Sequence, residues 1–165
     1  MPKKRLFSST KPLKILPLDT RAEPSPTKPF FKFRSEKKRF GLPIECTSYN
    51  VSGDATRRVN SGKGDLCDRD MVGWVRFVDR AGTAIVRKAP NGRCGSVKAG
   101  WILGVYPREP GTTSLSTLCY VDEIGNPCSS SKAIRSTHCG DFLVFEIPHP
   151  PNCPARACTD DYELH

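Results

Sequence analysis

The chain has 165 residues, enough for one domain with a tail, and a formal net charge of +9. Residues 1–45 contain 12 Lys/Arg and 4 Asp/Glu, whereas residues 46–165 contain the remaining 14 and 13. The basicity belongs to the first segment, so the whole-chain charge is poor evidence that the folded part binds nucleic acid. No run of about 18 apolar residues is present, so no membrane-spanning helix is expected.

The segment 1–41 is rich in Lys, Arg, Pro and Ser, and we expect it to be disordered because it cannot bury enough apolar surface to offset its ordering entropy. Lys37-Lys38-Arg39 fits either a polyanion-binding cluster or a dibasic processing site, but a functionally neutral tail is the favoured interpretation. Residues 11–18 are too interrupted by Lys and Pro to form the apolar core of a secretory signal. An extracellular protein with this N-terminus implies a wrong start, a fragment or an unconventional export route.

The eight cysteines lie in the nearly neutral part, are even in number and are spread over its whole length. Both features favour a disulfide framework in an oxidising compartment. Structural zinc sites place thiolates two to four residues apart, and this chain has no Cys-x-x-Cys, so no metal or other cofactor is expected. Eight cysteines allow 105 pairings, which spacing cannot resolve. The candidate disulfide residues are Cys46, Cys67, Cys94, Cys119, Cys128, Cys139, Cys153 and Cys158.

The folded part is expected over residues 42–160, with a short tail at 161–165. Near its start, Asn50-Val51-Ser52 is an acceptor sequence for N-glycosylation, so Asn50 is a candidate glycosylation site if the chain enters the secretory pathway.

A strand is predicted over residues 73–78, with Trp74 and Arg76 on one face and Val75 and Phe77 on the other. The closeness of Trp74 to a cysteine suggests an indole packed beside a disulfide.

After a turn at 79–82, residues 83–87 are predicted to pair with strand 73–78 as a hairpin. A buried segment at 100–104 and strands at 116–121 and 133–135 follow. The clearest strand is 141–147, whose nearly continuous apolar character indicates a central position in a sheet. The predicted core aromatic residues are Trp74, Phe77, Trp101, Phe142 and Phe145.

These elements predict an all-β fold: a small disulfide-rich module of short antiparallel strands and long loops, preceded by the disordered basic segment. Because Asp68 and Asp70 fall in a turn, as do Asp122 and Glu123, these acidic pairs are interpreted as solvated surface and not as catalytic carboxylates. His138 precedes Cys139, but a cysteine in a disulfide cannot act as a nucleophile. We therefore expect no catalytic residues and no enzyme.

A larger pattern joins the cysteines to the glycines and aromatic residues near them. It comprises Cys46, Cys67-Asp68, Gly73-Trp74-x-Arg76-Phe77, Cys94-Gly95, Gly100-Trp101, Cys119, Cys128, Cys139-Gly140-Asp141-Phe142, Cys153 and Cys158. This pattern resembles the eight-cysteine domain shared by uromodulin, zymogen-granule membrane glycoprotein 2 and oncoprotein-induced transcript 3 protein. Two departures are Val75, where tyrosine is usual, and single cysteines where the family has an adjacent pair.

The resemblance implies a secreted, glycoprotein-type, non-catalytic module for recognition or structure, active in adhesion or glycoprotein-mediated binding of a protein or glycan partner. The alternative is an intracellular basic protein that binds nucleic acid through residues 1–45, with its cysteines reduced or zinc-bound. A steep salt dependence of nucleic-acid binding that disappears on deletion of the tail would distinguish this alternative.

Overall fold

The computed structural model describes residues 41–91 and 94–164, and the predicted disordered segment lies almost entirely outside them. Within the described residues the regular structure consists of β-strands and 3-10 turns, which confirms the all-β prediction. The 3-10 turns are η1 (Ile44–Cys46), η2 (Ala55–Arg57), η3 (Asp68–Asp70) and η4 (Asp79–Ala81). The strands are β1 (Asn50–Ser52), β2 (Gly73–Phe77), β3 (Ala84–Ile85), β4 (Lys98–Leu103), β5 (Thr113–Val121), β6 (Ser130–His138), β7 (Leu143–Ile147), β8 (Ala155–Ala157) and β9 (Thr159–Asp160).

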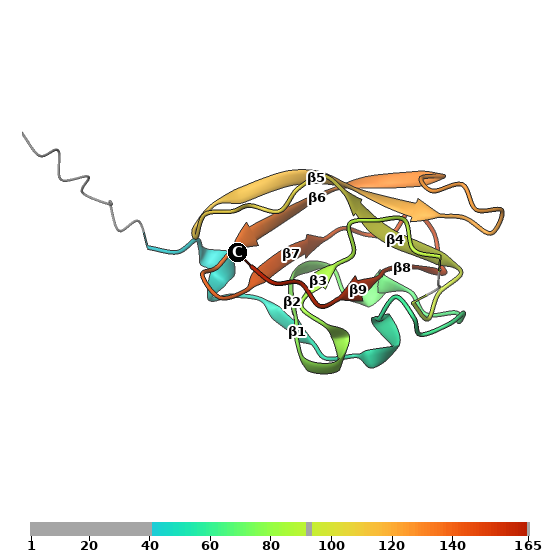
Figure 1. The fold of residues 1–165 in the computed structure, drawn as a ribbon, viewed down its shortest axis with the longest axis horizontal. Helices are drawn as coiled ribbons and strands as arrows, with labels where there is room; N and C mark the ends of the chain where they lie inside the picture. Colours follow the sequence, from blue (N-terminus) through green and yellow to red (C-terminus); the bar gives the residue numbers. More distant parts are fainter. Residues whose placement is uncertain (1–40, 92–93, 165) are drawn as a thin grey trace, which may run out of the picture. The chain divides into compact units, whose positions relative to one another are not determined.

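Seven strands form one sheet in the order β1-β2-β7-β6-β5-β4-β8 (Figure 1). The pairs from β2 to β4 are antiparallel, while the two outer pairs, β1 with β2 and β4 with β8, are parallel. β3 and β9 form a separate two-stranded sheet. The β7 strand lies between β2 and β6, as its nearly continuous apolar sequence predicted.

The alternation predicted for residues 73–78 is confirmed. Val75 and Phe77 on β2 enter the main core together with Phe145 from β7. Trp74 projects from the opposite face and packs against the cluster that contains the Cys46–Cys139 disulfide. The indole thus lies beside a disulfide, although its cysteines are 28 and 65 residues away in sequence.

The predicted hairpin between residues 73–78 and 83–87 is wrong. Residues 79–81 form η4, and Gly82 then takes a φ of +78°. This turn directs β3 away from β2, so β3 pairs with β9 near the C-terminal end. A Cβ atom at Gly82 would lie 2.6 Å from the Asp160 backbone carbon, so only glycine fits at this crossing.

The main core lies between the sheet and the covering layer of β3 and η4. Ala81 from η4 and Ile85 from β3 contact the inward side chains of the sheet there. Beyond β9 the chain remains against the module, since Tyr162 packs edge-to-face on Tyr106 with ring centroids 4.9 Å apart, and Leu164 packs against the main core.

Candidate recognition site and its framework

All eight cysteines form disulfides within the described residues. Three of these bonds link segments 64 to 93 residues apart, whereas the fourth closes a short turn between β5 and β6. Closing long loops removes the most conformational freedom from the unfolded chain, so the three long-range bonds dominate the covalent contribution to stability. The pairs are Cys46–Cys139, Cys67–Cys153, Cys94–Cys158 and Cys119–Cys128.

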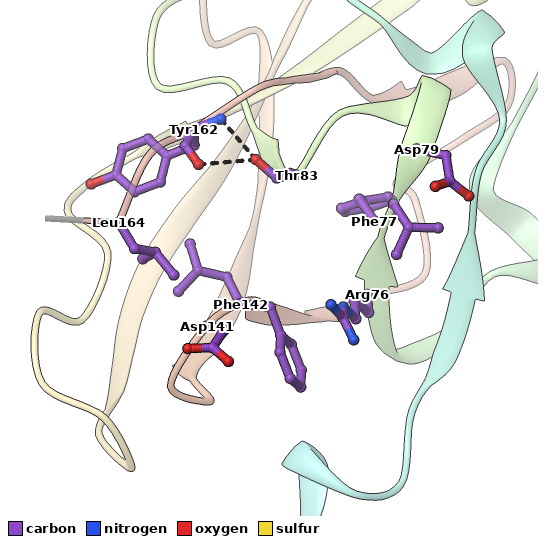
Figure 2. Close-up of a pocket in the computed structure, with 10 residues that line it drawn as sticks. Arg76, Phe77, Asp79, Thr83, Asp141, Phe142, Tyr162 and Leu164 are labelled. Atoms are coloured by element: carbon purple, nitrogen blue, oxygen red, sulfur yellow. Dashed lines mark hydrogen bonds between the residues drawn. The ribbon is translucent and has the colours of Figure 1, made fainter.

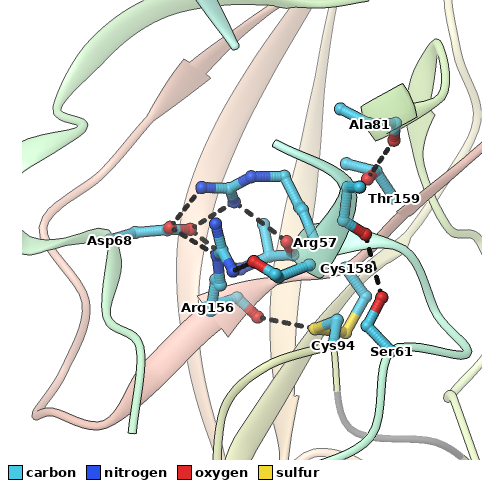
Figure 3. The surroundings of a disulfide bond; sticks show 11 residues. Arg57, Ser61, Asp68, Ala81, Cys94, Arg156, Cys158 and Thr159 are labelled. Carbon is cyan, nitrogen blue, oxygen red and sulfur yellow. Dashed lines mark hydrogen bonds and ion pairs between the residues drawn. A yellow bond between two sulfur atoms is a disulfide. The ribbon is translucent and has the colours of Figure 1, made fainter. Parts of the chain in front are cut away.

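A buried ion pair lies near the Cys94–Cys158 bond (Figure 3). The Arg57 guanidinium donates from Nη2 to Asp68 Oδ1 at 2.8 Å and from Nη1 to Oδ2 at 3.1 Å, and both side chains are 1% exposed. Asp68 Oδ2 also accepts the Ala157 backbone N–H at 2.9 Å, and Arg57 donates to the Ala157 carbonyl at 3.0 Å. One aspartate therefore positions η2, η3 and β8 together, because buried charges must be paired and hydrogen-bonded.

A second arginine extends this cluster toward the surface. Arg156 donates to Thr56 Oγ1 at 2.8 Å and to the Asp54 carboxylate, and its Nε lies 3.7 Å from Asp68 Oδ1. Burial lowers the pKa of Arg156, and the neighbouring positive charge of Arg57 lowers it further. Burial alone would raise the pKa of Asp54, but hydrogen bonds from Thr56 and Arg156 outweigh it and lower that pKa to about 2.

The interpretation of Asp68 as solvated surface is wrong. Asp70, two positions along the same 3-10 turn, is exposed as expected, so the sequence pattern could not separate the two acids. Sequence reasoning also missed Arg57 and Arg156, whose long aliphatic stems and charges fit a buried position only when a carboxylate meets them. The sequence feature that could have indicated burial of Asp68 is its position directly after a cysteine.

The five aromatic residues proposed for the core divide into two groups. Phe77 and Phe145 are 2% and 0% exposed and pack with ring centroids 5.7 Å apart in the main core. The other three are half-buried and pack in two smaller clusters outside the main core. These are Trp74 and Phe142 beside Cys46–Cys139, and Trp101 beside Cys94–Cys158.

A groove of about 310 Å³ lies between the end of β2, the start of β7 and the C-terminal segment (Figure 2). Phe77 and Leu143 contribute apolar surface, and the half-buried ring of Phe142 lines one side. Tyr162 closes the other side, where its backbone N–H donates to Thr83 Oγ1 at 2.7 Å and its carbonyl accepts from the same hydroxyl at 3.1 Å. Apolar walls with a few polar groups are the usual lining of a ligand site.

The positive charge of the groove is held by packing, whereas its two negative charges are exposed and have no partner among the described residues. The Arg76 guanidinium lies 3.8 Å from the Phe142 ring centroid and donates to the Tyr49 hydroxyl at 3.3 Å, so packing holds its charge in place. Asp79 and Asp141 are exposed at opposite ends of the groove (Figure 2), and within the part of the chain described neither carboxylate has a hydrogen-bond or ion-pair partner. A carboxylate only accepts hydrogen bonds, so these two ends suit ligand groups that donate them.

The glycosylation candidate Asn50 lies exposed on β1, at one edge of the large sheet. Among residues 41–91 and 94–164 no group of three or more His, Cys, Asp or Glu side chains is placed to hold a metal ion. In the same residues no helix has the length and apolarity needed to cross a membrane.

The fold and its four disulfides define a disulfide-bonded β module of the kind found in extracellular glycoproteins. Residues 75–159 match the family model of the uromodulin-like domain. Since this match spans more than half of the sequence, the chain belongs to that family, as the cysteine and aromatic pattern indicated.

Individual relatives agree with this assignment. The chain is 30% identical over 118 residues to uromodulin of Rattus norvegicus, an alignment that covers 70% of this chain and 18% of the relative. It is 29% identical over 118 residues to pancreatic secretory granule membrane major glycoprotein GP2 of Canis lupus familiaris, covering 70% and 23% respectively. The aligned part thus spans about a fifth of the length of these relatives.

Proposed function

We propose that this chain acts as a non-catalytic extracellular recognition or structural module, in adhesion or glycoprotein-mediated binding. The observation that carries the proposal is the complete pairing of its cysteines into four disulfides within a uromodulin-like fold. Such pairing persists in oxidising compartments and is rare where thiols are kept reduced. Reduced or zinc-bound cysteines, as the nucleic-acid alternative requires, do not agree with this arrangement.

The groove between β2 and β7 is the contact surface that we propose for a protein or glycan ligand. Two unpaired carboxylates, Asp79 and Asp141, accept hydrogen bonds from hydroxyl or amino groups at its ends. The ring of Phe142 offers an apolar surface on which the C–H face of a sugar or an aliphatic side chain packs. Its volume of about 310 Å³ suits one or two sugar units or a single large side chain.

Asn50 is proposed as the attachment site of an N-linked glycan, and its exposure at the sheet edge supports this. A glycan there would cover the open edge of β1, which otherwise presents unpaired backbone groups. The experiment is expression through a eukaryotic secretory pathway, followed by intact-mass measurement before and after glycosidase treatment. A mass loss on treatment that is absent in Asn50→Gln supports the site, and an unmodified secreted chain contradicts it.

The same secreted material tests the disulfide basis of the proposal. Without reductant the mass should lie about 8 Da below the reduced value, with no alkylation by a thiol reagent. Free thiols or a bound zinc mass would overturn the extracellular assignment.

Ligand binding is tested on a printed glycan array and on adhesion to cells stripped of surface glycans. Asp141→Asn and Asp79→Asn should each weaken binding about tenfold, because one charge-assisted hydrogen bond is lost. Asp70→Asn, an exposed acid outside the groove, is the matched control and should bind normally. Equal binding by all three variants would remove the groove from the proposal.

A further inference from the structure

A second groove, of about 540 Å³, is lined by residues 84–88 and 160–162 together with Tyr106. Its volume lies within the roughly 300–1,000 Å³ of ordinary ligand sites, and Ile85 and Val86 give it an apolar lining. Tyr162 is the one residue that also lines the groove between β2 and β7. The Tyr162 ring packs on Tyr106, and in Figure 2 it points away from Phe142. The ring therefore belongs to the second groove.

Backbone groups beside the second groove are already paired within the protein. The Val86 N–H donates to the Cys158 carbonyl at 2.9 Å, and the Val86 carbonyl accepts from the Ile102 N–H at 2.9 Å. The Ile85 carbonyl accepts from the Tyr106 hydroxyl, while β3 itself pairs with β9. A peptide that binds as an added strand needs such groups free. Side chains are therefore what hold a ligand in this groove.

One end of the second groove is acidic and paired within the protein. Asp160 lies opposite Ala84, the first residue of β3, and Asp161 follows it. The Arg58 guanidinium donates to both carboxylates, at 2.6 and 2.7 Å. One guanidinium uses only part of their hydrogen-bonding capacity, because each carboxylate has two acceptor oxygens. This end therefore accepts hydrogen bonds from ligand hydroxyl groups.

The other end is basic and has no acidic partner among the described residues. Arg87 and Lys88 come two and three positions after β3 there, and both are exposed. Arg87 Nε donates to the Gly104 carbonyl at 3.2 Å, and its guanidinium lies 5.5 Å from the Tyr106 ring centroid. These contacts orient the guanidinium. An oriented guanidinium beside an ammonium group is suited to bind one carboxylate.

We infer that the second groove is a binding site for an acidic sugar, whose carboxylate pairs with Arg87 and Lys88. The hydroxyl groups of the sugar then reach the acidic end. Two cations and a volume of about 540 Å³ suit a single carboxylate on two or three sugar units. A polyanion such as nucleic acid would need a longer row of unpaired basic residues. The ring of Tyr162, 36% exposed, offers a surface for the C–H face of a sugar.

The test is titration of the isotope-labelled, oxidised full chain with sialyllactose, followed through its backbone amide shifts in nuclear magnetic resonance. Lactose is the matched neutral probe, and a disaccharide that contains glucuronate distinguishes the two common kinds of acidic sugar. We expect a dissociation constant of roughly 1 mM for an acidic probe. Lactose should bind at least tenfold more weakly, because the charge-assisted hydrogen bonds are lost. The shifts should fall on residues 84–88 and not on residues 141–143.

Three variants test the basic end. Arg87→Gln should weaken binding of the acidic probe at least tenfold. Lys88→Gln should weaken it roughly threefold, because a flexible ammonium group makes a less directed contact than a guanidinium. The matched control is Arg69→Gln, which removes the same charge from an exposed residue on η3 outside both grooves and should bind normally. Near-ultraviolet circular dichroism confirms that each variant is folded.

Four results would overturn the inference. The first is no binding of either acidic sugar up to about 10 mM, and the second is equal binding of lactose. The third is equal weakening by Arg69→Gln and Arg87→Gln, since the cause is then overall charge. The fourth is tighter binding of an acetylated dipeptide of aspartate and glutamate, because the site then selects acidic peptides. None of these results involves Asp79, Asp141 or Asn50, so the proposed function keeps its own tests.

Discussion

Removing the buried carboxylate of Asp68 is the sharpest test of how the module is held together. In Asp68→Ala the guanidinium of Arg57, 1% exposed, loses both of its charge-assisted hydrogen bonds. Arg156 loses the nearby charge at 3.7 Å, and the Ala157 N–H loses its acceptor. The substitution therefore leaves one fully buried positive charge uncompensated.

Breaking one partner of a buried ion pair costs about 3–5 kcal/mol. That corresponds to a change of roughly 10²·²–10³·⁷ in the unfolding equilibrium constant. The loss is a large fraction of the stability of a small domain. The measurement is urea unfolding at neutral pH with disulfides intact, comparing wild type, Asp68→Ala and Asp70→Ala. Asp70 is exposed on the same 3-10 turn, so its replacement should stay within about 0.5 kcal/mol.

A double variant separates lost attraction from an unpaired charge. In Arg57→Met/Asp68→Ala no uncompensated arginine remains at position 57, so the double variant should be more stable than Asp68→Ala alone. The reasoning is refuted if Asp68→Ala costs less than about 1 kcal/mol, or if the double variant loses the sum of the single losses.

Three further predictions concern other parts of the framework. Replacing Cys46 and Cys139 by Ser opens a loop of 93 positions and should lower the free energy of unfolding by about 4.7 kcal/mol on the chain-entropy model. The same replacement of Cys119 and Cys128, separated by nine positions, should lower it by about 2.7 kcal/mol. Urea midpoints measure both losses, and equal losses would contradict the loop-length argument. Gly82→Ala should lower the melting temperature more than Gly125→Ala, because both glycines have positive φ but only a Cβ at position 82 meets backbone atoms. Similar melting temperatures of the two variants would contradict the close approach of Gly82 to the Asp160 backbone. The pKa of Asp54 is lowered to about 2, so its contribution to the free energy of unfolding is fully present above about pH 4 and is lost as the pH falls toward 2. Because Asp54 is 42% exposed, solvent screening reduces this loss to about 1 kcal/mol, which unfolding measured at acid pH should show in wild type but not in Asp54→Asn.

The sequence was sufficient for features that depend on local periodicity. The β2 strand alternates strictly, so the inward position of Val75 and the outward position of Trp74 follow from a period of two residues. The β7 strand is apolar on both faces, since Leu143, Phe145 and Ile147 enter the main core while Val144 packs beside Cys46–Cys139. That pattern predicted an interior strand correctly.

Pairing between strands that are distant in the chain could not be predicted from the sequence. The predicted hairpin of residues 73–78 with 83–87 had suitable strand and turn residues, but the true partner of β3 is β9, about 75 residues later. The choice depends on Gly82, whose positive φ and missing Cβ let the C-terminal segment cross closely. Likewise, only the folded structure brings Arg57 to Asp68 and to the backbone of Ala157.

The C-terminal segment 153–160 explains why these long-range features occur together. It supplies β8 and β9, two disulfide partners in Cys153 and Cys158, and the buried Arg156. The partners of this segment in strand pairing, disulfides and side-chain hydrogen bonds lie within residues 54–100, so the segment joins the first half of the module to the end of the chain. Short strands gain little from pairing alone, with three residues in β8 and two in β9. The disulfides and the Arg57–Asp68 pair therefore hold this closing segment in place, and the groove depends on the same closure because Tyr162 follows it directly.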